Sequence, residues 1–230
     1  MIQLHHVRSS IGKKVLMALS GAALVVFLIS HLAGNLLIFA GPEALNAYAL
    51  KLRKLSVWLW VARAGLLAAV IIHIVTSVQL AIENRRARPQ GYHVYHPGET
   101  NWARRTMMLS GVLVLAYLLY HLLHFTFHVA HPALTRFTDD AGHNNVYAMV
   151  VMSFRQWPIT LAYIAGMACV CLHLSHGVGS TFQTLGLTSE RSVPIATWFG
   201  RLFALVMFVG YSSIPLAVWC GWVGRDLIAT

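Results

Sequence analysis

The segment VLMALSGAALVVFLISHLAGNLLIFA, residues 15–40, contains no charged side chain. An α-helix rises about 1.5 Å per residue and needs roughly 20 apolar residues to cross the hydrocarbon core of a bilayer. The segment is therefore long enough to form a transmembrane helix. It is too long for the apolar region of a cleaved signal peptide and lacks a small-x-small cleavage pattern, so we expect this helix to be retained.

Four further apolar runs follow along the chain, at residues 57–82, 107–130, 159–185 and 196–222. The chain of 230 residues is 57% hydrophobic and only 10% charged, which is outside the range of ordinary soluble domains. The sequence predicts an all-α integral membrane protein, a single domain of five transmembrane helices over residues 1–230. The connecting segments are too short to form a soluble catalytic domain.

The basic residues are distributed unequally between the two ends of these helices. If the N-terminus is cytoplasmic, ten of the 17 Lys and Arg residues lie on the cytoplasmic side. The positive-inside rule therefore favours a cytoplasmic N-terminus, in an inner membrane of the bacterial type. The net charge of +10 does not require a nucleic acid, because anionic lipid headgroups or an acidic partner would also attract it. We find no basic and aromatic pattern typical of nucleic-acid binding.

Histidine is unusually frequent, with 13 residues in the chain. Those within the apolar runs are His31, His73, His121, His124, His173 and His176, and His128 lies near the end of the third run. An ionisable side chain in hydrocarbon is costly unless it faces the interior of the bundle and has a partner. Each of these histidines is therefore a candidate functional residue.

Haem iron is a partner that neutral imidazoles on facing helices can hold. Counted from the predicted cytoplasmic boundary, His31 lies 17 residues beyond Lys14 and His121 lies 16 beyond Arg105. Both are therefore about 25 Å deep at a rise of about 1.5 Å per residue. The sequence predicts that this outer pair binds one b-type haem.

A second pair of histidines lies closer to the cytoplasmic side. His73 precedes Arg85 by 12 residues and His173 precedes Gly186 by 13, so both are roughly 18 to 20 Å deep. We expect this inner pair to bind a second b-type haem. Zinc is a weaker alternative, because a tetrahedral site needs its ligands at one depth.

Several motifs surround these histidines: SSIGKKVLMALSGAALVVFLISHLAGN around His31, HIVTSVQLAIENRRARP from His73, YHLLHF around His121, and HLSHGVGSTFQTLGL from His173. Over nearly the whole chain they resemble the dihaem cytochrome b subunit of type B succinate:quinone oxidoreductases, which include quinol:fumarate reductases. The last motif matches the family pattern His-x3-Gly with a later Gly. This match favours His173 over His176 as the ligand.

The resemblance implies a membrane anchor for two partner subunits of a succinate dehydrogenase, an enzyme of the tricarboxylic acid cycle. A flavoprotein with FAD and a protein with iron-sulfur clusters would lie on the cytoplasmic face and carry out the succinate chemistry. Electron transport would then run through both haems to or from membrane quinone, usually menaquinone. We expect the partners to dock on a basic cytoplasmic loop and its flanks, containing Arg85, Arg86, Arg88, Arg104 and Arg105.

One departure concerns proton transfer. Some similar fumarate reductases carry a glutamate two residues before the histidine of the fourth helix, where this chain has Cys171. No Asp or Glu lies within any of the five apolar runs. A transmembrane proton pathway is therefore not expected from the resemblance.

Other polar residues in the third run are candidates for cofactor contacts. His124 and His128 follow His121 at helical spacings of three and seven residues, so they are predicted to share its face nearer the outer surface. We expect them to reach the propionates of the outer haem or a quinone head group. For His128, an interfacial position without a cofactor contact is equally open. The sequence leaves the remainder of the quinone site unassigned.

Candidates on the other helices have alternatives of the same weight. Arg63 would pair with a propionate of the outer haem or extend to the outer headgroups. His176 would bind a propionate of the inner haem or form a hydrogen bond between helices. Glycines in these helices are explained by plain helix packing or by close contact with a haem, and Gly177, one turn from His173, is the best candidate for the haem contact.

Three other functions remain open at this point. The chain could be the cytochrome b subunit of another respiratory complex, such as a nitrate reductase or hydrogenase. A proton-coupled transporter could use intramembrane histidines, although we find neither the carboxylates nor the internal repeats typical of one. The third alternative is a membrane scaffold without a cofactor.

Overall fold

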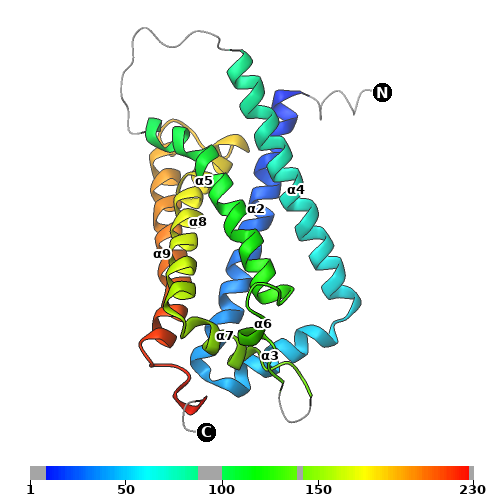
Figure 1. Cartoon of the computed structure of the whole chain (residues 1–230). Helices are drawn as coiled ribbons and strands as arrows, with labels where there is room; N and C mark the ends of the chain where they lie inside the picture. Colours follow the sequence, from blue (N-terminus) through cyan, green and yellow to red (C-terminus); the bar gives the residue numbers. More distant parts are fainter. Residues whose placement is uncertain (1–8, 88–99, 139–141, 228–230) are drawn as a thin grey trace.

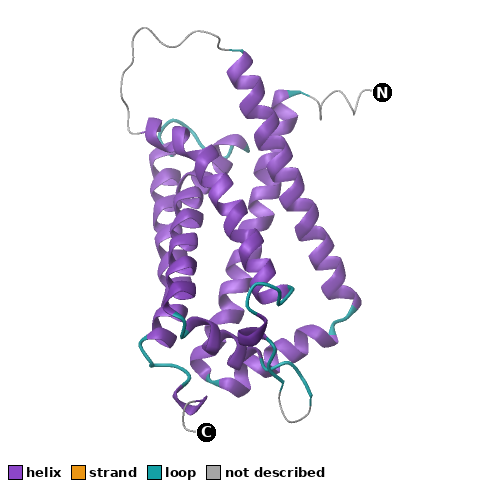
Figure 2. Ribbon diagram, viewed as in Figure 1, coloured by secondary structure: helices purple, strands orange, loops and turns teal. Residues whose placement is uncertain are grey.

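The computed structural model describes residues 9–87, 100–138 and 142–227, with the side chains of 100–105 and 226 excepted. These residues are almost entirely helical (Figure 2), and their one β-type pairing is an isolated bridge between Thr138 and Asn144. The helical elements in chain order are α2 (Ser10–Asn35), η1 (Leu36–Ala40), α3 (Pro42–Lys54), α4 (Val57–Arg86), α5 (Thr100–His121), η2 (Leu122–Thr126), α6 (Pro132–Thr135), α7 (Val146–Phe154), α8 (Trp157–Thr184), α9 (Val193–Trp219) and η3 (Arg225–Leu227).

Five helical segments of the described residues are long and apolar enough to cross a membrane, so the predicted all-α, five-helix architecture is confirmed. Their bounds are Ser10–Ala40, Val57–Arg86, Thr106–Thr126, Trp157–Thr184 and Val193–Trp219. One difference from the sequence concerns the third helix, which was expected to reach residue 130. It ends at Thr126 because α5 gives way to a π-helical turn, η2, after His121.

The five long helices form two groups. The most extensive packing is between α8 and α9, and α5 also lies along α8. On the other side α4 packs on α2, while α2 additionally contacts α8 and α9. In Figure 1, α4 lies beside α2 at the upper end of the bundle and diverges from it toward the lower end. The pair α2 and α4 therefore faces the pair α5 and α8.

The upper end of the bundle in Figure 1 holds the start of α2, the end of α4 and the start of α5. Here the Lys13 ammonium of α2 donates to the Glu83 carboxylate of α4, which ties these two helices together. The Arg85 and Arg86 side chains are exposed at the same end. For the predicted docking loop, Arg88 and the side chains of Arg104 and Arg105 lie outside the described residues.

The lower end of the bundle carries a cap of three short helices, α3, α6 and α7 (Figure 1). The α7 helix, VYAMVVMSF, is buried against α3, α6, α8 and α9, and its Val151 and Ser153 have no exposed surface. The side chain of Asn46 in α3 accepts the backbone N–H of Tyr147 at 3.0 Å and donates to Asn145 at 3.0 Å. These bonds hold α3 against the start of α7.

Two features break the helices on either side of the cap. The α3 helix begins at Pro42, whose missing N–H costs nothing in a first turn, and Ser56, with φ of 39°, separates it from α4. His128, after the end of η2, also has a positive φ, 54°, which is uncommon for a residue other than glycine. The expected α-helical stripe from His121 to His128 is therefore interrupted.

Candidate functional site

The structure brings four histidines into the two pairs expected from the sequence. In the outer pair, the ring centres of His31 on α2 and His121 on α5 are 6.0 Å apart, with their planes at 85°. In the inner pair, the ring centres of His73 on α4 and His173 on α8 are 6.3 Å apart, with their planes at 73°. Both pairs span the space between the two helix groups.

The two pairs lie at different levels of the bundle. Tyr163 of α8 has its ring centre 5.9 Å from that of His121, so it marks the level of the outer pair. His173 lies ten residues further along α8, and at about 1.5 Å per residue this is about 15 Å. The outer pair lies on the side of the cap, and the inner pair lies toward the end where α2 begins.

The separation within each pair suits an iron ion held between two imidazoles. A metal–nitrogen bond of about 2 Å on each side, plus about 1 Å from each nitrogen to its ring centre, places the centres about 6 Å apart. Neither α2 with α5 nor α4 with α8 packs closely along its length. The rings thus meet across a space between helices, as a flat macrocycle lying between them would require.

The Nδ1 atom of His73 has protein partners. It lies 3.1 Å from the backbone oxygen of Met17 and 3.5 Å from the hydroxyl oxygen of Ser20. A carbonyl oxygen can only accept, so Nδ1–H donates to Met17 and Nε2 keeps its lone pair. Hydrogen bonding of this kind fixes the tautomer and the orientation of metal-binding histidines.

His173 is arranged in the same way. Its Nδ1 lies 3.1 Å from the hydroxyl oxygen of Ser110, which itself donates to the backbone oxygen of Met107 at 3.0 Å. The hydroxyl proton is thereby used, so the oxygen accepts Nδ1–H of His173. Both histidines of the inner pair therefore present an unprotonated Nε2.

Each ring of the inner pair also lies against a glycine of a neighbouring helix. A Cβ atom added to Gly21 would lie 3.2 Å from Cε1 of His73, and one added to Gly111 would lie 3.6 Å from Cε1 of His173. The first distance is tighter than ordinary van der Waals contact. Gly21 thus makes room for the His73 ring.

Aromatic side chains surround the outer pair. The His31 ring stacks on Phe27 with centres 5.2 Å apart, and the Tyr211 ring of α9 lies 6.2 Å away. The Tyr211 hydroxyl donates to the backbone oxygen of Leu28 at 2.8 Å, which joins α9 to α2. The fifth long helix, which carries no histidine, therefore forms part of the wall of this site.

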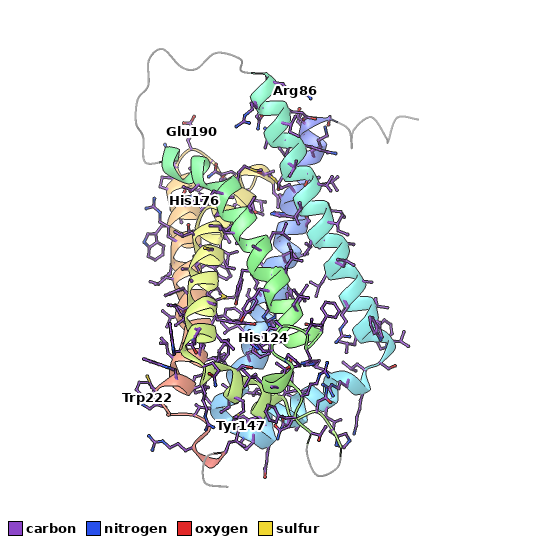
Figure 3. The ribbon with its side chains drawn as sticks, in the orientation of Figure 1. Arg86, His124, Tyr147, His176, Glu190 and Trp222 are labelled. Carbon is purple, nitrogen blue, oxygen red and sulfur yellow. The ribbon has the colours of Figure 1, made fainter. Side chains whose placement is uncertain are left out.

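His124 lies in a more enclosed position than its sequence neighbours, in the lower part of Figure 3. It has no exposed surface, and its Nδ1 and Nε2 lie 3.0 Å from the Tyr163 hydroxyl and 3.1 Å from the Ser153 hydroxyl. Both ring nitrogens therefore already have protein partners. A contact of His124 with a propionate or quinone stays a prediction, and it would require one of these bonds to break.

His128 and Arg63 lie toward the end of the bundle that carries the cap. Nδ1 of His128 is buried and has no hydrogen-bond partner among the described residues. Burial, with the nearby cations Arg136 and Arg53, lowers the pKa of His128 below its usual value. The guanidinium of Arg63 lies 5.0 Å from the centre of the Trp60 ring, on an exposed part of α4. For both residues, the propionate contact and the interfacial position stay predictions.

His176 and Gly177 follow His173 on α8, toward the end where α2 begins (His176 is labelled in Figure 3). His176 is partly buried. A Cβ atom added to Gly177 would meet no atom within 4 Å, whereas one added to Gly179 would lie 3.2 Å from a backbone oxygen of α9. Close helix packing therefore explains Gly179 but not Gly177, beside which space remains for a group outside the protein.

The described part of the chain contains no group of three or more His, Cys, Asp or Glu residues placed to hold a metal ion. These residues therefore provide no set of ligands for the zinc site that was the weaker alternative. The cysteines Cys169, Cys171 and Cys220 are unpaired. Comparisons of the chain with models of protein families, with curated proteins and with solved structures found no match.

Proposed function

We propose that this chain is a dihaem cytochrome b that anchors a succinate dehydrogenase in the membrane and passes electrons between an iron-sulfur subunit and quinone. The observation that carries the proposal is the presence of two histidine pairs, each separated by the distance that suits iron ligation, at two levels of one bundle. The outer pair would hold one haem b and the inner pair a second. Each haem, when bound, would supply a one-electron carrier.

The protein itself contributes orientation and exclusion of water. Met17 and Ser110 accept the Nδ1–H groups of His73 and His173. The Nε2 atom of each ring is thereby left free to bind iron. Phe27 and Tyr211 cover the His31 ring on the outer level. Such fixed hydrogen bonds and apolar walls are the features by which a protein tunes a bound redox centre.

The assignment to succinate dehydrogenase rests on the motifs around the four histidines. The described residues form membrane-spanning helices and a small cap, so the oxidation of succinate would take place in the flavoprotein subunit. Exposed Arg85 and Arg86 support docking of the partners at the end where α2 begins. That end would face the cytoplasm, with the chain in the inner membrane and menaquinone as the favoured substrate.

A spectroscopic experiment tests the proposal. The purified chain, expressed with haem available, should show b-type bands in a reduced minus oxidised spectrum and contain two haems per chain. A spectrum without such bands would refute the cytochrome proposal and leave a transporter or scaffold. Purification of the intact complex would then identify the partners: a flavoprotein and an iron-sulfur protein support succinate dehydrogenase, and nitrate reductase or hydrogenase subunits contradict it.

A further inference from the structure

Three polar side chains, those of Tyr163, His124 and Ser153, link His121 to the cap. The Tyr163 hydroxyl oxygen lies 3.5 Å from Nδ1 of His121 and 3.0 Å from Nδ1 of His124. Nε2 of His124 in turn lies 3.1 Å from the hydroxyl oxygen of Ser153. The chain of contacts therefore passes from the end of α5 through α8 and η2 to α7.

These groups are enclosed by protein. His124 and Ser153 have no exposed surface and Tyr163 is 5% exposed. Phe154, with its ring centre 5.0 Å from that of Tyr163, and Phe125, 4.0 Å from that of His124, cover the network. A buried polar group without a hydrogen bond is costly, so the protons of this network must be arranged consistently.

Two arrangements satisfy the network. In the first, His121 donates Nδ1–H to the Tyr163 oxygen, the Tyr163 hydroxyl donates to Nδ1 of His124, and Nε2–H of His124 donates to Ser153. In the second, every bond is reversed, and Nδ1 of His121 accepts the Tyr163 proton. A neutral histidine that accepts at Nδ1 carries its proton on Nε2 and cannot bind a metal through that atom.

We infer that Tyr163, held by His124 and Ser153, is a positioning residue that keeps the Nε2 lone pair of His121 available for iron. The inference rests on the proposed function. In the arrangement with iron bound, Tyr163 accepts Nδ1–H of His121, and the tautomer of His124 is set in the same step. The inner pair has shorter supports, a backbone oxygen for His73 and one serine for His173, so this network belongs to the outer level alone.

The loss of the Tyr163 hydroxyl has a defined electronic effect. A hydrogen bond donated by Nδ1–H makes the imidazole a more basic ligand, which favours the oxidised iron. Tyr163→Phe keeps the ring and its aromatic contacts but removes the acceptor. We expect the ratio of reduced to oxidised outer haem at a fixed potential to rise about tenfold, which is about 59 mV for a one-electron couple.

The experiment is a redox titration of the haems in the intact membrane complex. Tyr163→Phe is compared with Tyr120→Phe, a matched control in the same aromatic cluster, whose hydroxyl lies 3.2 Å from Nε2 of His131 instead. The two haems are distinguished by His31→Ala and His73→Ala variants. We expect a positive shift of the outer haem in Tyr163→Phe, and unchanged potentials in Tyr120→Phe.

Ser153→Ala provides a second variant that leaves Tyr163 in place. It should shift the potential of the outer haem in the same direction by a smaller amount. This variant tests the inference even if Tyr163→Phe prevents assembly of the complex. Two bound haems with an unchanged outer potential in both variants, or a shift of the inner haem, would overturn the inference while the cytochrome proposal stands. A wild-type complex without haem would overturn both together.

Discussion

The hydroxyl oxygen of Ser110 lies 3.1 Å from Nδ1 of His173, on a neighbouring helix, and the same hydroxyl donates to the backbone oxygen of Met107. The serine is buried, so water does not replace it. With its proton used in that bond, the hydroxyl oxygen can only accept from the histidine ring. This hydrogen bond places the proton of His173 on Nδ1, so Nε2 is the nitrogen that can bind a metal.

Replacement of Ser110 by alanine should therefore weaken the inner haem site. The loss of a hydrogen-bond partner of a ligand typically costs about 10- to 100-fold in metal affinity, and we expect a loss in that range for the inner haem. Ser175→Ala on α8 is the control, because this hydroxyl donates to the backbone oxygen of Leu172 instead. Haem content after dilution measures the effect, and equal retention in both variants would contradict it.

The pairing of the histidines predicts which variants share a phenotype. His73→Ala and His173→Ala should lose the same haem, and His31→Ala and His121→Ala should lose the other, because each pair is proposed to supply both ligands of one iron. Low-temperature difference spectra of the four variants resolve the two centres. A shared loss in His31→Ala and His73→Ala would show that the pairing is wrong.

A methyl group at Gly21 should displace the ring of His73. The added Cβ would lie 3.2 Å from Cε1 of His73, so the ring has to move by a few tenths of an ångström and loses its alignment. We expect lower occupancy of the inner haem in Gly21→Ala. Gly65→Ala on α4, where the added Cβ meets no atom within 4 Å, should leave both haems in place. A similar loss in the two variants would point to a general effect on the helices.

The open space beside Gly177 predicts a separation of folding from cofactor binding. Because a Cβ there meets no protein atom within 4 Å, Gly177→Leu should leave the helical content and the melting temperature of the haem-free chain unchanged. The larger side chain would occupy the space next to His173, so haem content should fall. Circular dichroism and haem quantification check the two parts, and full haem content would refute the expected contact.

His128 predicts a dependence of stability on pH. Its pKa is lowered in the folded protein by burial and by Arg136 and Arg53, whereas the unfolded chain titrates near the usual 6.5. The contribution of His128 to the free energy of unfolding is therefore constant well above pH 6.5. It decreases as the pH falls through 6.5, because the unfolded chain takes up the proton at a higher pH than the folded protein does. His128→Asn removes the titrating group and tolerates the positive φ. The melting temperature should fall less on acidification in this variant than in the wild type.

The features that follow from the regular geometry of an α-helix could be predicted from the sequence. The five long helices follow from apolar length, and the pairs His31 with His121 and His73 with His173 follow from a constant rise per residue. The same reasoning failed at the end of α5, where a π-helical turn after His121 shortens the helix. Nothing in the helical periodicity marks such a turn.

The short helices α6 and α7 of the cap and the Tyr163 network were not predicted. The apolar run of α7 is too short to cross a bilayer and lies in a segment that was expected to be a loop. Tyr163 and Ser153 reach His121 and His124 from residues far away in the sequence, through packing that the spacing of residues on one helix does not encode. Tyrosines and serines within apolar segments were the available signal, and they are as typical of ordinary helix packing.

The packing of α4 on α2 also determines an order of events during synthesis. These two helices leave the ribosome first and, joined by the Lys13–Glu83 ion pair, can associate as a hairpin before the rest of the chain exists. At that stage His31 and His73 are each only half of a site. The outer pair is completed when α5 is inserted and the inner pair when α8 is inserted, so the proposed haem binding at the inner level would have to wait for the fourth membrane crossing.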